Sequence, residues 1–123
     1  MARGRVLIIE DDVDVATTTI EILTDRGYEV KAVTTAEEGL ATIPAFQPDV
    51  LLLDMSLPGL SGPRLVGMFR HANPKLPIIV VTSMVDREII GQITDMKPFQ
   101  FVHKPYDPDV LHGLITAAIE RGR

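Results

Sequence analysis

Five short runs of aliphatic residues recur along the chain and alternate with segments whose apolar residues follow helical spacing. The runs are rich in β-branched residues, as strands are, and they occupy residues 5–10, 28–33, 49–54, 77–82 and 99–103. The first, third and fourth are continuously apolar, which is typical of central parallel strands that are covered on both faces. The second alternates between apolar and polar residues, so we expect it at an edge of the sheet.

The segments between and after these runs predict five helices. In four of them apolar or small residues recur every three to four positions, at Val15, Thr19, Ile22 and Leu23; at Leu65, Met68 and Phe69; at Ile89, Ile90, Ile93 and Met96; and at Leu111, Leu114, Ile115, Ala118 and Ile119. The second helix has a capping box of Thr35 and Glu38 at its start. We expect this helix to run to about Ala45, although Pro44 disturbs its last turn.

Strict alternation of strands and helices predicts a (βα)5 α/β fold, a doubly wound, parallel five-stranded sheet with right-handed crossovers. The length of 123 residues fits one domain, and we assign residues 1–123 to it. In such sheets, ligands bind beyond the carboxyl ends of the strands, near the point where the strand order reverses. Functional side chains are therefore expected where the strands end.

Composition narrows the class of protein further. Hydrophobic residues make up 46% of the chain and charged residues 24%, a balance typical of globular proteins. No apolar run approaches the roughly 18 residues of a membrane span, and the N-terminal aliphatic run is too short for a signal peptide, so we expect a cytoplasmic protein. The chain has no cysteine, and its 12 basic residues are scattered over a chain of net charge −5. We therefore expect neither thiolate chemistry nor direct binding to nucleic acid or membrane.

Charged and hydroxyl side chains stand where the predicted strands end. The first strand ends in Glu10 and Asp11, Asp54 ends the third, Thr82 ends the fourth, and Lys104 follows the fifth. A lone carboxylate at the end of a buried strand costs several kcal/mol unless a charged or hydrogen-bonding group meets it. Carboxylates within about 4 Å also repel each other by roughly 4 kcal/mol per pair at an effective dielectric constant near 20. These acids therefore require a cation.

The oxygen-rich set of ligands favours Mg²⁺ as that cation, beside the single charge of Lys104. Magnesium keeps several of its waters and usually takes one or two carboxylates from the protein. It commonly binds phosphoryl groups as well. A phosphoryl group held there can be attacked in line by the Asp54 carboxylate, which forms an aspartyl phosphate.

The chain resembles a response-regulator receiver domain of two-component signalling, with the CheY-like, flavodoxin-like fold. The motifs that carry the resemblance are the acid pair after VLII, the aspartate after VLLL, the following LPGLSG, the threonine after IIVV, and KP after the fifth strand. They occur in the order and spacing of the family and cover essentially all 123 residues. Each motif alone is weak, but together, at strand ends, they are specific.

The resemblance implies a role for each matching residue at the metal site. Glu10 and Asp11 match the acidic pair that holds Mg²⁺, directly or through water. Asp54 matches the phosphoacceptor and a further metal ligand. Ser56 falls where the family contributes a backbone carbonyl to the metal.

The resemblance also implies roles around the phosphoryl group. Thr82 matches the hydroxyl that hydrogen-bonds it, and Lys104 matches the lysine that pairs with it. Phe101 sits at the position of the switch aromatic, which turns inward when Thr82 moves toward the phosphate. Ordinary core packing is an equally good interpretation of Phe101 from sequence, and Asp12 beside the acid pair fits a helix cap.

The partners implied by the family are a histidine kinase or a histidine phosphotransfer domain as donor, and an unknown downstream protein. The output surface would be formed by the fourth helix, the fifth strand and the fifth helix, and homodimerisation through these helices stays open. Many receivers carry a Gly-Ala pair before the fifth strand, where this chain has Lys97 and Pro98. Pro98 removes a backbone donor, so we expect the fourth helix to end early or differently.

Three alternatives to a phosphorylated signalling domain remain. An aspartyl-phosphate phosphatase or phosphotransferase of the haloacid dehalogenase type usually has a second aspartate two residues after the nucleophile, where this chain has Ser56. A flavodoxin-like cofactor binder needs a Ser/Thr/Gly-rich loop after the first strand, where this chain has EDDVDVA. The third is a receiver fold that serves only as a docking module, without phosphorylation. The resemblance itself implies a domain that phosphorylates itself and slowly dephosphorylates, rather than an enzyme.

Overall fold

Five parallel strands form one sheet in the order β2-β1-β3-β4-β5. The computed structural model describes residues 3–54, 62–82, 87–95, 98, 100–104 and 106–122. Each strand lies within one residue of its predicted bounds: β1 (Arg5–Ile9), β2 (Glu29–Val33), β3 (Val50–Asp54), β4 (Ile78–Thr82) and β5 (Gln100–His103). The strand order reverses between β1 and β3, because β1 pairs with β2 on one side and with β3 on the other.

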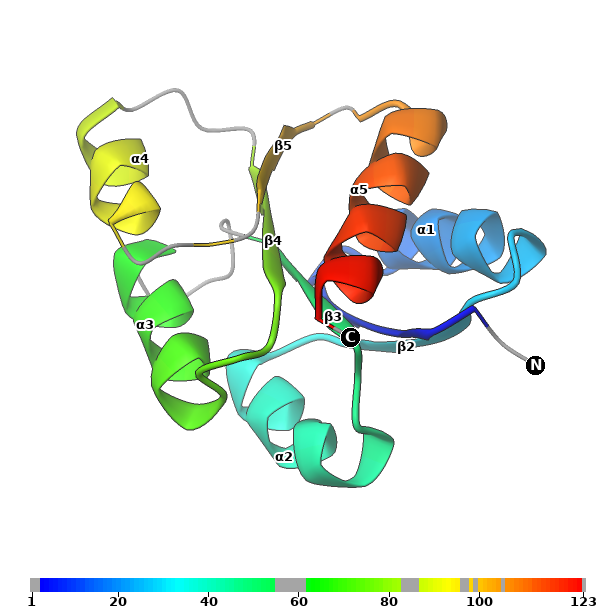
Figure 1. Cartoon of the computed structure of the whole chain (residues 1–123), viewed down its shortest axis with the longest axis horizontal. Coiled ribbons are helices and arrows are strands. Elements are labelled where there is room, and N and C mark those ends of the chain that lie inside the picture. Colours follow the sequence, from blue (N-terminus) through cyan, green and yellow to red (C-terminus); the bar gives the residue numbers. More distant parts are fainter. Residues whose placement is uncertain are drawn as a thin grey trace.

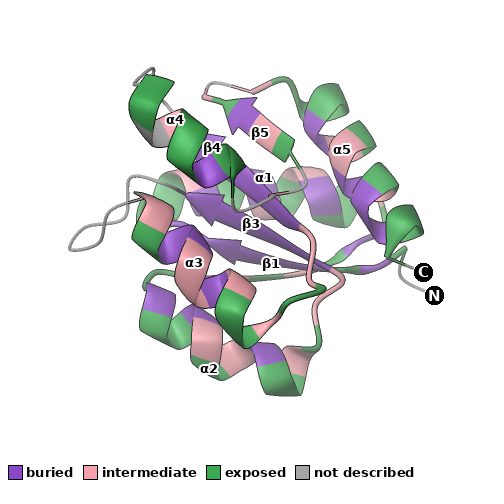
Figure 2. Ribbon diagram, turned by 60° about the vertical axis from the view of Figure 1, so that its left-hand side comes forward, coloured by how far each residue is buried: buried purple, intermediate pink, exposed green. Residues whose placement is uncertain are grey.

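Burial explains why the strands take these places in the sheet. In β3 and β4 every residue is buried, and in β1 all but the first are, as befits central strands that helices cover on both faces. The alternating β2 lies at one edge, as the sequence predicts, and β5 lies at the other. The three apolar runs therefore form the centre of the sheet, which is seen buried between helices in Figure 2.

Five helices connect and follow the strands, as the apolar periodicity predicts. Their bounds are α1 (Val13–Asp25), α2 (Ala36–Phe46), α3 (Gly62–Ala72), α4 (Arg87–Thr94) and α5 (Pro108–Arg121). Asp12 caps α1 by accepting hydrogen bonds from the amides of Asp14 and Val15 at 3.0 and 3.2 Å. The hydroxyl of Thr35 caps α2 by accepting from the amide of Glu38 at 3.1 Å.

Helix α4 ends before Pro98. This helix spans eight residues and ends at Thr94, with the amide of Asp95 still donating to the carbonyl of Gly91 at 3.2 Å. Of the apolar positions predicted for this helix, Met96 lies outside the described residues, as does Lys97. The described part of α4 is therefore short.

Helices cover both faces of the sheet, and Figure 1 shows α1 and α5 on one side and α2, α3 and α4 on the other. Side chains of the strands alternate between the two interiors. One interior holds Leu7, Ile9, Leu51, Leu53, Ile78 and Val80 with residues of α2, α3 and α4; the other holds Val6, Ile8, Val50, Leu52, Ile79 and Val102 with residues of α1 and α5. Among the described residues, no helix is both long enough and apolar enough to cross a membrane.

Candidate functional site

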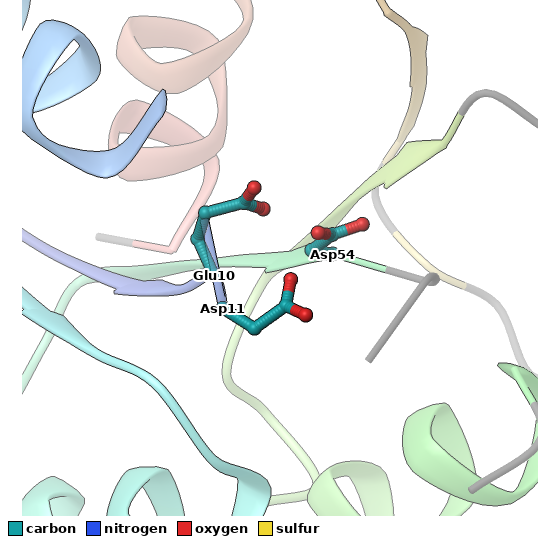
Figure 3. Close-up of side chains that lie close together, drawn as sticks. All are labelled: Glu10, Asp11 and Asp54. Atoms are coloured by element: carbon teal, nitrogen blue, oxygen red, sulfur yellow. The ribbon is translucent and has the colours of Figure 1, made fainter. Parts of the chain in front are cut away.

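Three carboxyl groups meet at the carboxyl edge of the sheet. Glu10 and Asp11 directly follow β1, and Asp54 is the last residue of the neighbouring β3. One oxygen from each lies within 4.8 Å of the others, and Figure 3 shows the three side chains gathered at the ends of these strands. Glu10 and Asp54 are only 4% and 2% exposed, whereas Asp11 faces solvent. The adjacency of β1 and β3 thus brings together acids that are far apart in the sequence.

The ammonium group of Lys104 lies between two of these acids. The Nζ atom of Lys104 donates to Glu10 Oε1 and Oε2 at 3.2 and 3.3 Å, and to Asp54 Oδ2 at 3.2 Å. The backbone also holds Lys104, because its amide donates to the carbonyl of Thr82 at 2.9 Å and so extends the pairing of β4 with β5. This contact offsets the cost of burying the Asp54 carboxylate, for which the sequence alone gives no explanation.

The pKa of Glu10 is shifted because several ionisable groups lie close together. Burial, together with hydrogen bonding to Asp54 and repulsion from it, raises the pKa of Glu10 to about 8, although Lys104 opposes that rise. Burial lowers the pKa of Lys104, but the carboxylates of Asp54 and Glu10 more than offset it and raise its pKa above the usual value. One ammonium therefore does not fully balance the acids of the site.

The donor set fits a small, hard divalent cation. Three carboxylate-bearing residues with no imidazole among them offer the oxygen ligands that Mg²⁺ prefers, and the exposed Asp11 leaves that side open to water ligands. An acidic triad of this kind is typical of the Mg²⁺ site of receiver domains. Glu10 can bind such an ion only after it loses its proton, which a divalent charge promotes.

The other residues singled out from the sequence lie in different parts of the fold. Thr82 is buried at the end of β4, and Phe101 on β5 is partly buried against the interior that contains α2, α3 and α4. Asp12, next to the acid pair, is the cap of α1. Ser56 lies outside the described residues.

Two residues beside the acids escaped the sequence analysis as members of the site. Thr19 on α1 and Tyr106, two residues after Lys104, hydrogen-bond to each other through their hydroxyl groups. Both line the small cavity that also contains Glu10, Asp54 and Lys104. The sequence signal for Thr19 is a polar residue among the apolar positions of the first predicted helix.

Fold and site together define a class of protein: a two-component signalling domain that carries an acidic pocket at the carboxyl edge of a CheY-like sheet. Residues 6–116 match the response regulator receiver domain family. The chain belongs to this family, whose members are typically signalling domains rather than catalytic enzymes. The expected family and fold are both confirmed.

Two solved receiver domains illustrate the likeness. The response regulator receiver domain protein (CheY-like) from Methanospirillum hungatei JF-1 has a TM-score of 0.89 at 30% identity, and the match covers 96% of this chain and 94% of that chain. The signal receiver domain of a modulated diguanylate cyclase from Desulfovibrio desulfuricans G20 has a TM-score of 0.85 at 34% identity, with coverage of 97% and 95%. Both are matched along nearly their whole length.

Curated relatives include much longer regulators. The DNA-binding transcriptional regulator NtrC of Salmonella typhimurium is 29% identical over 119 residues, which are 97% of this chain but 25% of that protein. Protein Rrf1 of Nitratidesulfovibrio vulgaris is 27% identical over 118 residues, which are 94% of this chain and 83% of that protein. The chain thus spans about a quarter of NtrC and most of Rrf1.

Proposed function

We propose that this chain is a phospho-accepting receiver that takes a phosphoryl group onto Asp54. The observation that carries the proposal is the position of the Asp54 carboxylate, buried at the end of β3 beside Glu10 and Asp11 and 3.2 Å from the Lys104 ammonium. A buried carboxylate that is held among a cation and further acids is suited to attack phosphorus rather than to stabilise the fold.

The donor in this proposal is a phosphohistidine on a histidine kinase or a histidine phosphotransfer domain. A carboxylate oxygen of Asp54 attacks the phosphorus atom, a P–O bond forms as the P–N bond breaks, and the imidazole leaves with a proton. Glu10, Asp11 and Asp54, with the backbone carbonyl of Ser56, would hold Mg²⁺, which neutralises charge on the phosphoryl oxygens when bound. Lys104 pairs with one of these oxygens, an interaction for which its ammonium already lies close to Asp54.

Phosphorylation then changes the electrostatic surroundings of Lys104 and Thr82. The modified Asp54 carries close to two negative charges and new acceptor oxygens. Hydrogen bonds from Lys104 and Thr82 to those oxygens favour one of two arrangements of α4, β5 and α5, with Phe101 as the residue that changes its packing. This surface then binds a downstream protein.

The test is labelling by a small phosphodonor, acetyl phosphate, in the presence of Mg²⁺. The unmodified chain is expected to gain one phosphoryl group, and Asp54→Asn is expected to gain none, because the amide cannot form the acyl phosphate. Asp12→Asn is the matched control, since asparagine caps a helix as well as aspartate does. Full labelling of Asp54→Asn would disprove that Asp54 is the phosphoacceptor. Labelling of the unmodified chain that persists after Mg²⁺ is chelated would contradict the proposal as well.

A further inference from the structure

One buried polar residue remains unexplained by the proposed chemistry. Four polar or charged residues are buried in the described part of the chain: Glu10, Thr19, Asp54 and Thr82. Three of them belong to the acidic site and have a role in the proposed phosphoryl transfer. The fourth, Thr19, is 3% exposed and lies on the apolar face of α1, where an aliphatic residue would avoid the cost of burying a hydroxyl group.

The hydrogen bonds of Thr19 indicate what its hydroxyl does. The hydroxyl has one proton, which it donates to the carbonyl of Val15 at 2.9 Å. The same hydroxyl also shares a hydrogen bond with the phenolic hydroxyl of Tyr106. Thr19 thus links Tyr106 to the backbone of α1.

The Thr19–Tyr106 pair lies directly beside the lysine of the site. Thr19, Tyr106, Val15 and Lys104 line the small cavity that contains Glu10 and Asp54. The same four residues also line a groove of about 580 Å³, together with further residues of α1 and Pro108 at the start of α5. The small cavity and the groove thus share Lys104 and the Thr19–Tyr106 pair.

Lys104 needs a rigid support because of its chemistry and its place in the fold. An ammonium on a flexible four-carbon chain has many conformations, so its backbone must be fixed for it to reach both acids. On the N-terminal side the edge strand β5 and the Thr82 carbonyl hold it. On the C-terminal side, the side chain of Tyr106 ties the segment that leads into α5 to α1.

We propose that the Thr19–Tyr106 hydrogen bond positions Lys104 for phosphoryl transfer, with Thr19 and Tyr106 as positioning residues that do not touch the phosphoryl group. The inference deepens the function proposed above and rests on it. Loss of the hydrogen bond frees the segment after β5, and a small displacement of a catalytic group is enough to slow a reaction strongly.

The experiment compares labelling rates by acetyl phosphate at saturating Mg²⁺. Tyr106→Phe and Thr19→Val each remove one hydroxyl group and are expected to slow labelling by about tenfold. Thr19→Ser keeps the hydroxyl and is expected to retain the unmodified rate. The double variant Tyr106→Phe with Thr19→Val should be no slower than either single variant, because both remove the same interaction.

The structure supplies a matched control for a merely structural role. Tyr28, directly before β2, makes the same kind of bond to a threonine hydroxyl, that of Thr116 on α5, away from the acids. Tyr28→Phe should lower the melting temperature about as much as Tyr106→Phe does, yet leave the labelling rate unchanged.

Three outcomes separate the possible failures. Labelling of Tyr106→Phe at the rate of Tyr28→Phe would overturn the positioning role, and so would a rate for Thr19→Ser as low as that of Thr19→Val. Failure of the unmodified chain to label would instead overturn the proposed function itself.

Discussion

Lys104 is the residue on which the electrostatics of the site depend. Its ammonium contacts two carboxyl groups that are almost fully buried, and those groups also repel each other. A buried arrangement of this kind seldom adds net stability, because desolvation offsets the attraction. We therefore interpret the cluster as one that serves chemistry rather than folding.

The raised pKa of Glu10 leads to a prediction about stability and pH in the absence of metal. The folded chain keeps the proton of Glu10 up to about pH 8, whereas the unfolded chain loses it near the ordinary value of 4.5. The folded state thus binds more protons over this range, so the contribution of Glu10 to the free energy of unfolding is fully present below pH 4.5 and is lost as the pH rises to about 8. Urea unfolding in a chelating buffer, repeated at several pH values across this range, measures this loss of stability.

The matched variant for this prediction is Glu10→Gln, which keeps the shape of the side chain without a titrating proton. Its free energy of unfolding should fall less steeply across the same range than that of the unmodified chain. Glu120→Gln, at an exposed position of α5, should keep the original pH dependence. Equal slopes for the unmodified chain and Glu10→Gln would contradict the explanation. The raised pKa of Lys104 does not interfere, since its effect is lost only above its ordinary value of 10.5.

Individual site residues could be predicted to different extents. Glu10, Asp11, Asp54, Thr82 and Lys104 stand at strand ends, so alternation alone brings them to one edge of the sheet, where the structure places them. The distribution of protons among them is not visible in the sequence, because it depends on distances and burial. The partnership of Thr19 with Tyr106 is equally hidden, since nothing local links two residues on separate elements.

At the scale of single elements, a glycine on α2 allows that helix to approach the sheet closely. A methyl group at Gly39 would lie 2.4 Å from Ile9 Cδ1, 3.1 Å from Ile9 Cγ1 and 3.2 Å from the ring of Phe69. Ile9 directly precedes the acid pair, so α2 packs closely against the end of β1 that leads into Glu10. A methyl group at Gly39 therefore requires the side chain of Ile9 to shift.

The close approach predicts opposite effects of two glycine-to-alanine changes. Gly39→Ala should lower the free energy of unfolding by about 1–3 kcal/mol, because the core must shift to accept the methyl group. Gly113→Ala, in an open position of α5, should raise it by about 0.5–1 kcal/mol, because alanine favours the helix. Chemical denaturation measures both. Stabilisation by Gly39→Ala would show that the packing of α2 on β1 is looser than described.

The ends of the elements were predictable where a local signal exists. Thr35 caps α2, and the helix runs to Phe46 despite Pro44, one residue beyond the expected end. Glu38 accepts from the hydroxyls of Thr34 and Thr35 at 3.3 and 3.4 Å, so its carboxylate contacts side chains at the start of the helix. Such details depend on the rotamers of neighbouring residues, which a sequence pattern does not specify.

For the molecule as a whole, the acidic site assembles only when the sheet does. Its residues come from the ends of β1, β3 and β4 and from the segment after β5, so the unfolded chain has no such site. A ligand that binds only the folded state stabilises it by mass action. The apolar pattern predicted which strands are central and that β2 lies at an edge, and the resemblance to receiver domains implied the CheY-like fold, as observed. The pattern alone does not give the exact pairing, because pairing depends on contacts distant in sequence.

Because Mg²⁺ would bind only the folded state, we predict that it raises the stability of the whole domain. At about one hundred times its dissociation constant, the ion should add about 2.7 kcal/mol to the free energy of unfolding. At the same concentration of Mg²⁺, the free energy of unfolding of Asp11→Asn, which changes the exposed acid, should rise less. That of Asp12→Asn should rise as much as that of the unmodified chain. Thermal unfolding with and without the ion measures the difference. An equal rise in the free energy of unfolding for Asp11→Asn would show that Asp11 does not bind the metal.

The two interiors on opposite sides of the sheet have a practical consequence for anyone who redesigns this protein. Since successive side chains of β1, β3 and β4 point to different sides, a combinatorial library can randomise the contacts beneath α1 and α5 and leave those beneath α2, α3 and α4 as they are. Selection for altered packing or stability in one layer can then proceed while the opposite layer keeps the scaffold folded.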